Sequence, residues 1–153
     1  MAVEFVLAQE GVIYDDPRDS GGLTKWGISA LVYPQVSSPE FTREDAIQIY
    51  RSNYWNRCSC DQFPPGLALL LFDSAVNQGP AAAIRMMQKS IGAKADGVIG
   101  PDTLAKASAA LSSAMAEMAA RRLYAYGMVP TFTVFGLGWC RRTCACLKLA
   151  LAF

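Results

Sequence analysis

Apolar residues recur at helical spacing along most of this chain. Near the N-terminus Val3, Val6 and Leu7 repeat at intervals of three and four, which predicts a helix over residues 2–10 that stops at Gly11. Thr42 precedes an acidic turn and is typical of an N-cap. The pattern predicts further helices from Thr42 to Tyr50, over 67–78, over 81–90, from Pro101, over 112–126 and from about Gly138.

Residues 11–28 interrupt this helical pattern. They combine Gly and Pro with short pieces that favour strands, which predicts a loop or a small β-hairpin. DGVIGPDT, at 96–103, predicts a structural turn with Pro101 at the first position of a helix. No internal repeat and no low-complexity linker separates these elements. The fold class is therefore expected to be mainly α, with one irregular loop or hairpin near the N-terminus.

Composition limits the possible classes of partner. The chain has 153 residues, of which 52% are hydrophobic and 18% charged, so it is long enough to bury a core as one compact unit. Its net charge of +1 argues against nucleic acid as the main partner. No acidic residue follows Glu117, so the last part of the chain either favours an anionic envelope or presents a solvated basic face. The basic residues there are Arg121, Arg122, Arg141, Arg142 and Lys148.

The chain has five cysteines and no histidine. Without histidine, the commonest general base is missing and hydrolytic chemistry has to use carboxylates. The pairs Cys58/Cys60 and Cys144/Cys146 have C-x-C spacing, whereas zinc sites usually use C-x2-C or histidine. We therefore expect no metal and no other cofactor. An odd number of cysteines indicates free thiols buried as small apolar groups.

Glu10 is the first candidate for catalysis. It continues the apolar stripe of the first helix, where a carboxylate is unfavourable without a partner or a purpose. It also lies at the negative end of the helix dipole, and both effects favour its protonated form, as a general acid requires. The alternative is that Glu10 turns to solvent at a frayed helix end.

Asp19 and Thr24 follow in the segment D-S-G-G-L-T, where glycines allow the loop to fold back toward the helix end. Thr24 is suited to holding a water molecule or orienting a carboxylate. The alternative for Asp15, Asp16 and Asp19 is turn chemistry, because Asp is favoured in Asx-turns beside Pro and Gly.

Several ordered segments resemble one known family. EGVIYDDPRDSGGLTKWGIS, at 10–29, resembles the signature of glycoside hydrolase family 108, the N-acetylmuramidases of phage endolysins and related secretion-associated muramidases. The resemblance continues through AIQIYRSNYW, at 46–55, and FDSAVNQG, at 72–79, to GWCRR near the end. MQKSIGAKADGVIGPDTL, at 87–104, is similar to the predicted peptidoglycan-binding part of this family.

The resemblance implies a lysozyme-like helical fold that cuts the β-1,4 bond between N-acetylmuramic acid and N-acetylglucosamine. The catalytic glutamate of the family corresponds to Glu10, and Asp19 and Thr24 would activate or place the water. The resemblance also implies a catalytic part over 1–86 and a helical peptidoglycan-binding-like part over 87–153, packed on it as one unit. The chain departs from the family pattern at Val12 and Ile13, where the family has Gly and Tyr, and Tyr14 substitutes for the aromatic residue.

The candidates for substrate binding lie farther along the chain. Asn77 and Gln78 are expected to hydrogen-bond acetamido groups, while Asp73 either fixes the loop that carries Thr24 or belongs to a buried network. The aromatic residues Tyr54 and Trp55 either stack on sugar rings or belong to the core.

Three classes of function remain. The leading one is a muramidase that acts as a monomer on peptidoglycan glycan strands, as expected of a phage or prophage endolysin. The second is a noncatalytic cell-wall binding module. The third is a structural or interaction protein of a phage particle or secretion apparatus, with the tail LKLALAF as a docking strip.

The sequence also leads to an expectation about how the protein reaches the cell wall. The start of the sequence has no signal peptide, and the apolar stretches are too short or too interrupted for stable membrane insertion. We expect synthesis in the host cytoplasm and action in the periplasm or cell wall after release through a holin or another route.

Overall fold

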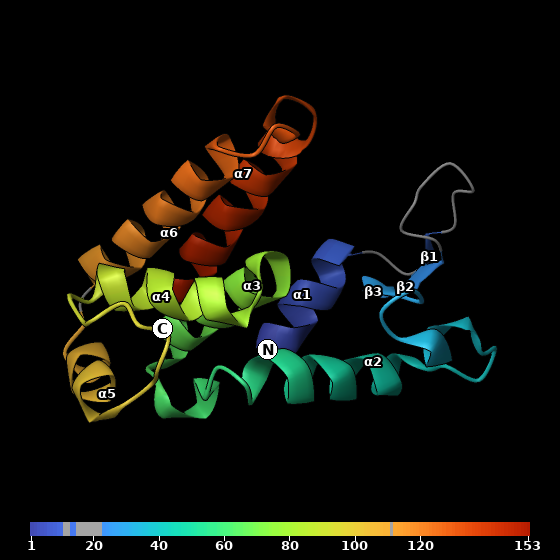
Figure 1. Cartoon of the computed structure of the whole chain (residues 1–153), viewed down its shortest axis with the longest axis horizontal. Coiled ribbons are helices and arrows are strands. Elements are labelled where there is room, and N and C mark those ends of the chain that lie inside the picture. The colour runs from blue at the N-terminus through green and yellow to red at the C-terminus, as the bar shows by residue number, and fades with distance from the viewer. Residues whose placement is uncertain (11–12, 15–22, 111) are drawn as a thin grey trace. The chain divides into compact units, whose positions relative to one another are not determined.

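The computed structural model describes residues 1–10, 13–14, 23–110 and 112–153. Figure 1 shows a mainly α-helical chain with one small sheet near the N-terminus, which confirms the predicted fold class. The described residues form two compact units, Met1–Asn53 and Tyr54–Phe153. The division at residue 86 that the resemblance implies lies within the helix Pro80–Ser90 and remains a prediction.

The first unit combines two helices with a three-stranded antiparallel sheet of order β1-β2-β3. Helix α2 begins with a capping box, in which the Thr42 backbone N–H donates to Asp45 Oδ2 at 2.8 Å and the Asp45 N–H donates to Thr42 Oγ1 at 3.2 Å. The predicted N-cap is therefore confirmed. The elements of this unit are α1 (Ala2–Glu10), β1 (Ile13–Tyr14), β2 (Thr24–Lys25), β3 (Ile28–Ser29), a 3-10 turn η1 (Pro34–Ser37) and α2 (Arg43–Tyr50). A π-helical turn, η2 (Arg51–Trp55), follows α2.

The second unit is built around one buried helix. Every side chain of α3 from Leu67 to Ala75 is buried, and the helix packs against α4, α6 and α7. A helix that is covered on all sides needs an apolar sequence without a polar face, and LALLLF supplies it. The elements of this unit are η3 (Cys60–Gln62), α3 (Pro65–Gln78), α4 (Pro80–Ser90), α5 (Pro101–Ser108), α6 (Ser112–Gly127) and α7 (Phe132–Ala150).

The predicted DGVIGPDT turn is confirmed, and one buried glutamine organises it. The Gln88 amide nitrogen donates to Asp96 Oδ1 and to the Val98 carbonyl, while its amide oxygen accepts from the Gly97 N–H at 2.8 Å. Gly97 has φ +84°, a conformation that glycine adopts without strain. The segment is thus a structural turn leading into α5, which begins at Pro101 as predicted.

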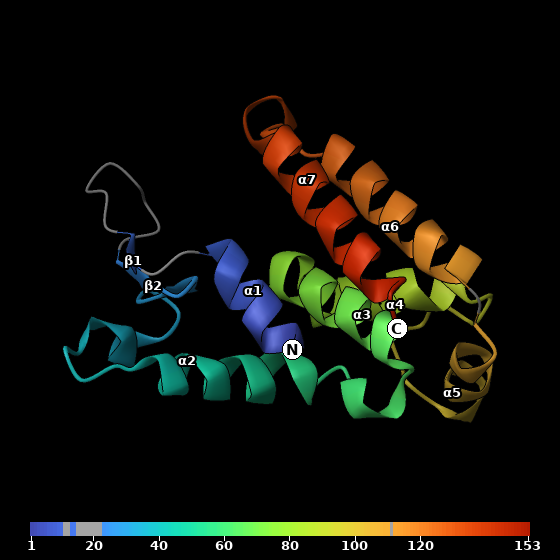
Figure 2. The same cartoon turned by 180° about the vertical axis from the view of Figure 1, so that it is seen from behind.

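The last helix begins earlier than its sequence indicates. α7 starts at Phe132, six residues before the predicted Gly138, although the segment contains two glycines and a β-branched pair. Figures 1 and 2 show α7 running beside α6 along its length. The Phe132 ring lies over Gly136 one turn later in the same helix, and α7 also packs on α6, so packing stabilises helix where intrinsic propensity is low.

Candidate active site

Glu10 lies at the end of α1, and its side chain is half-buried against a glycine. A Cβ placed on Gly27 would lie 2.5 Å from Glu10 Cγ and 2.7 Å from Tyr50 Oη. The absence of a side chain at Gly27 therefore allows the Glu10 side chain and the Tyr50 hydroxyl to share this space. Glu10 was expected either to continue the apolar stripe of the helix or to turn to solvent. In the structure its side chain packs against Gly27 within the first unit and is only partly exposed.

The turn that contacts Glu10 is a tight two-residue connection between β2 and β3. Trp26 has φ +50° and Gly27 has φ +76°, and positive φ at both positions is typical of a type I′ hairpin turn. A tryptophan in this conformation is strained and has to be held by its surroundings. The Tyr50 hydroxyl donates to the Trp26 carbonyl at 2.8 Å, and the Phe41 ring lies 5.9 Å from the Trp26 ring.

Thr24 lies on the strand that leads into this turn. It pairs with Tyr14 on β1 and with Ser29 on β3, so the sheet fixes its backbone on both sides. The third proposed catalytic residue, Asp19, lies outside the described residues, as do Asp15 and Asp16. For Tyr14 only the backbone is described. The structure thus brings Glu10 to the turn that follows Thr24.

Trp26, Gly27 and Tyr50 are site residues that the sequence analysis did not identify. A Trp-Gly pair between two short strands is a recognisable hairpin signal, because glycine at the second position suits a type I′ turn. Tyr50 gives no such signal, because it lies 40 residues from Glu10 and fits the apolar pattern of the predicted helix 42–50. Only the packing of α2 on the turn shows that its hydroxyl faces the Glu10 side chain.

In the second unit Asp73 belongs to a buried ion cluster. Arg122 Nη1 lies 2.5 Å from Asp73 Oδ2, and Arg142 Nε donates to Asp73 Oδ1 at 2.9 Å. Both Asp73 and Arg122 are fully buried. Two guanidinium groups thus bind the carboxylate, which matches the buried-network alternative for Asp73 better than direct contact with a substrate.

Tyr126 completes this cluster. The Arg122 Nε–H donates to the Tyr126 hydroxyl at 2.9 Å, and the Arg122 guanidinium also lies over the Tyr126 ring. Burial alone would lower the pKa of Arg122, but the neighbouring Asp73 and Tyr126 outweigh it and the net shift of this pKa is upward. Burial raises the pKa of Tyr126, so its hydroxyl stays protonated. Arg122 therefore remains charged inside the unit.

Asn77 and Gln78 lie at the C-terminal end of α3, and both are half-buried. The Asn77 amide nitrogen donates to the Asp73 carbonyl at 3.3 Å, within the helix. Gln78 Oε1 is buried and accepts no hydrogen bond from any residue that the structure describes. A buried acceptor without a donor is unfavourable, and an acetamido N–H is one group that would satisfy it.

The aromatic candidates have partners within the second unit. Trp55 Nε1–H donates to Asp61 Oδ1 at 2.9 Å, and the Trp55 ring packs edge-on against Phe72 with 5.4 Å between centroids. Tyr54 is half-buried and starts the turn that precedes Cys58. The half-buried Trp55 ring therefore packs on α3, and Trp55 remains a predicted sugar contact.

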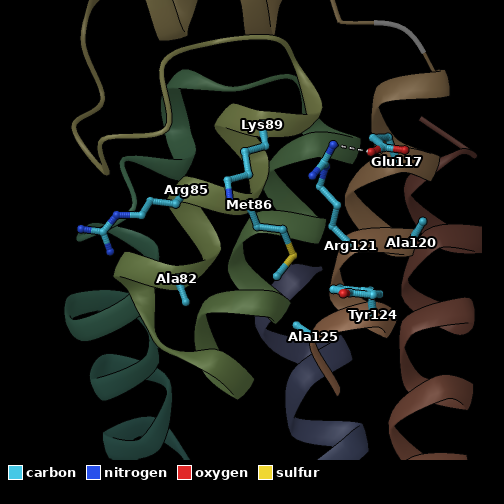
Figure 3. Close-up of a pocket in the computed structure, with 9 residues that line it drawn as sticks. All are labelled: Ala82, Arg85, Met86, Lys89, Glu117, Ala120, Arg121, Tyr124 and Ala125. Atoms are coloured by element: carbon cyan, nitrogen blue, oxygen red, sulfur yellow. Dashed lines mark ion pairs between the residues drawn. The ribbon is translucent and has the colours of Figure 1, made fainter. Parts of the chain in front are cut away.

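A groove of about 630 Å³ separates α4 from α6 (Figure 3). Met86 and Lys89 from α4 face Arg121 and Tyr124 from α6, and Arg121 is paired with Glu117 at 2.7 Å. The head of Arg85 points away from Arg121, toward Gly97.

The cysteines are distributed between core and surface as free thiols. Cys58, Cys60 and Cys146 are buried, Cys140 is half-buried and Cys144 is exposed. The hydrogen bond with Cys60 lowers the pKa of Cys58 and raises that of Cys60, while burial raises the pKa of Cys146. Across the described ranges, no three Cys, Asp or Glu side chains come together as a group that would hold a metal ion.

None of the helices that the structure describes has the length and apolar character needed to cross a bilayer.

Comparison with known proteins identifies the family. The Glycosyl hydrolase 108 family model matches residues 3–79, a range that includes every candidate site residue from Glu10 to Gln78. The solved structure of Brucella abortus SagA is similar to this chain with a TM-score of 0.87 and 35% sequence identity, and the match covers 99% of this chain and 92% of that chain. No curated protein sequence matches this chain.

Proposed function

The chain belongs to the glycosyl hydrolase 108 family, and from this premise we propose that it is a lysozyme-type muramidase. Its substrate is the β-1,4 bond between N-acetylmuramic acid and N-acetylglucosamine in bacterial peptidoglycan. The observation that carries this proposal is the placement of Glu10, a half-buried residue whose side-chain methylene groups lie against Gly27 beside the Tyr50 hydroxyl.

Glu10 is proposed as the general acid. The sugar oxygen is a poor leaving group, so a proton has to reach it as the glycosidic bond breaks. Glu10 would donate this proton and be left as a carboxylate. The contact of its methylene groups with the Trp26–Gly27 turn supports this role, because it restricts where the carboxyl group can lie.

Asp19 and Thr24 are proposed to supply the water. In this role Thr24 holds the water molecule, and Asp19 accepts its proton as the oxygen bonds to the anomeric carbon. The position of Thr24 supports this role, since β2 leads directly into the turn that contacts Glu10.

The acetamido groups of the glycan strand are proposed to bind Asn77 and Gln78. Both side chains are half-buried at the C-terminal end of α3, and this position supports the role. Tyr14, Tyr54 and Trp55 remain predicted sugar contacts. Asp73 is proposed to act indirectly, by fixing the end of α3 that carries Asn77.

Replacing Glu10 with Gln tests the acid role. Glutamine keeps the shape of the side chain but has no proton to transfer, so the hydrolysis rate should fall by on the order of a hundredfold or more. The measurement is turbidity loss of purified cell walls, followed by reducing-end analysis of the products. The folded state and the binding of the variant to cell walls should be unchanged.

Glu4→Gln is the matched control, since Glu4 lies on the same helix and forms an exposed ion pair with Arg43. Exposed ion pairs contribute little, so this variant should clear cell walls at the wild-type rate. A Glu10→Gln protein that retained near wild-type activity would refute the assignment. The proton donor would then have to be sought among Asp15, Asp16, Asp19 and Asp73.

We further propose that the protein is a bacteriolytic phage or prophage endolysin, made in the cytoplasm and released to the wall through a holin or another route. The resemblance of residues 10–29 to endolysin muramidases supports this role. Cells that produce the wild-type chain should lyse when their inner membrane is permeabilised, and cells that produce Glu10→Gln should not. Lysis by both proteins would instead favour a noncatalytic wall-binding or secretion-associated role.

A further inference from the structure

The tip of the α6–α7 hairpin has an unusual distribution of charge. No residue from 123 to 140 carries a charged side chain, and an arginine pair flanks this stretch on each side, Arg121-Arg122 and Arg141-Arg142. Because the two helices run side by side, both pairs lie on the arms of one hairpin (Figures 1 and 2). The end of the hairpin is therefore uncharged and has a basic collar.

Large apolar side chains are exposed at this end. We call residues 128–137 the hairpin tip. Met128 is 70% exposed, Val134 73% and Leu137 65%, while Phe135 and Val129 are exposed to 55% and 41%. Single exposed apolar residues are ordinary, but a group within ten residues indicates a contact surface.

The tip is a fixed structure with its own aromatic support. The Trp139 ring stacks on Tyr126 with 4.9 Å between centroids, and Phe135 lies 5.9 Å from Trp139. The Gly136 backbone is covered by the Phe132 ring. These contacts hold Val134 and Leu137 outward on the first turns of α7. Their exposure is therefore built into the hairpin.

The collar determines which surface fits the tip. Arg122 and Arg142 turn inward to Asp73, whereas Arg121 and Arg141 are exposed. Glu117 is the last acidic residue of the chain, and it is already paired with Arg121. A second copy docked symmetrically by this tip would bring two basic collars together, with no acidic residue on either hairpin beyond Glu117 to pair with them. The matching surface is apolar inside and anionic at its rim.

We propose that the hairpin tip docks on an anionic lipid bilayer. Met128, Val134, Phe135 and Leu137 enter the boundary between headgroups and acyl chains, and the exposed Arg141 meets the lipid phosphates. Trp139 and Tyr124 lie between these two levels, where amphipathic rings are favoured. The hairpin rests on the membrane surface without crossing it.

Vesicle co-sedimentation tests the proposal with the full-length protein. The wild-type chain should sediment with phosphatidylcholine vesicles that contain phosphatidylglycerol, and less with phosphatidylcholine alone. Val134→Asp/Leu137→Asp should weaken the partition coefficient by on the order of tenfold or more, because two exposed apolar groups no longer enter the lipid. Arg141→Gln should weaken binding to the anionic vesicles by about fivefold and leave binding to the neutral vesicles unchanged.

Val32→Asp is the matched control, because Val32 is 69% exposed but lies outside the tip, in the first unit. It should bind vesicles like the wild type. Circular dichroism should show all variants folded, and each should degrade purified cell walls at the wild-type rate, since such walls contain no membrane.

Equal vesicle binding by the wild type and the tip variants would overturn the proposal, and so would no binding by the wild type. Self-association in sedimentation velocity that is lost in Val134→Asp/Leu137→Asp would assign the tip to a second copy and also overturn it.

Discussion

At the scale of single residues, Gly27 controls the surroundings of Glu10. Its left-handed backbone closes the β2–β3 turn, and its missing side chain leaves space for the Glu10 methylene groups and the Tyr50 hydroxyl. The same residue therefore has a conformational role and a spatial role. A variant that separates the two roles shows how far the turn positions the proposed acid.

Gly27→Ala should reduce cell-wall hydrolysis by on the order of tenfold to a hundredfold, because the new Cβ displaces Glu10 from its position. It should also destabilise the protein by about 1–3 kcal/mol, since alanine is strained at this φ.

Gly92→Ala is the control for Gly27→Ala: Gly92 has φ +71°, but an added Cβ would meet nothing within 4 Å. It should show a comparable loss of stability with no loss of activity. Equal activities for the two variants, measured per folded molecule, would show that contact with Gly27 does not position Glu10.

At the scale of elements, a capping box formed by Thr42 and Asp45 marks the start of α2. The Thr42 backbone and side-chain hydrogen bonds lower the pKa of Asp45, so the carboxylate form is favoured in the folded protein. A carboxyl group with a lowered pKa stabilises the fold above its ordinary pKa. This stabilisation is lost as the pH falls through the lowered value.

Thr42→Ala should lower the Tm by about 2–4 °C at neutral pH, because the capping box is removed. The difference from the wild type should shrink in acid, as Asp45 becomes protonated. Differential scanning calorimetry at neutral and acidic pH measures both effects.

Thr131→Ala is the control, because Thr131 precedes α7 without a side-chain cap hydrogen bond. It should change the Tm much less than Thr42→Ala does. Equal effects of the two substitutions would mean that the capping box does not stabilise α2.

At the scale of the whole molecule, the Asp73 cluster joins three helices of the second unit. Asp73 comes from α3, Arg122 from α6 and Arg142 from α7. These residues are 49 and 69 positions apart from Asp73, and the cluster connects the C-terminal helix to the central one. Removing one member leaves the charges of the others buried without compensation.

Asp73→Ala should lower the free energy of unfolding by about 3–5 kcal/mol, as measured by urea titration, because two arginines lose their carboxylate partner. Asp102→Ala is the control, because it removes an exposed ion pair with Lys106. This substitution should change the free energy of unfolding by less than about 1 kcal/mol. If both changes had the same small effect, the cluster would not stabilise the second unit.

Features that depend on neighbours in the chain can be predicted from the amino-acid sequence of this protein. Helical periodicity located α1, α3, α4 and α6, Thr42 marked the start of α2 and Pro101 that of α5, and the ordered motifs indicated the family and Glu10. These signals are local because a helix forms hydrogen bonds within four residues and a cap within three.

Features that depend on distant partners became visible in the packed structure. It placed the Tyr50 hydroxyl beside Glu10, enclosed Asp73 between two arginines and extended α7 to Phe132 against low local propensity. Burial and pairing between residues tens of positions apart arise only when the chain packs, so the pattern of any one segment does not contain them.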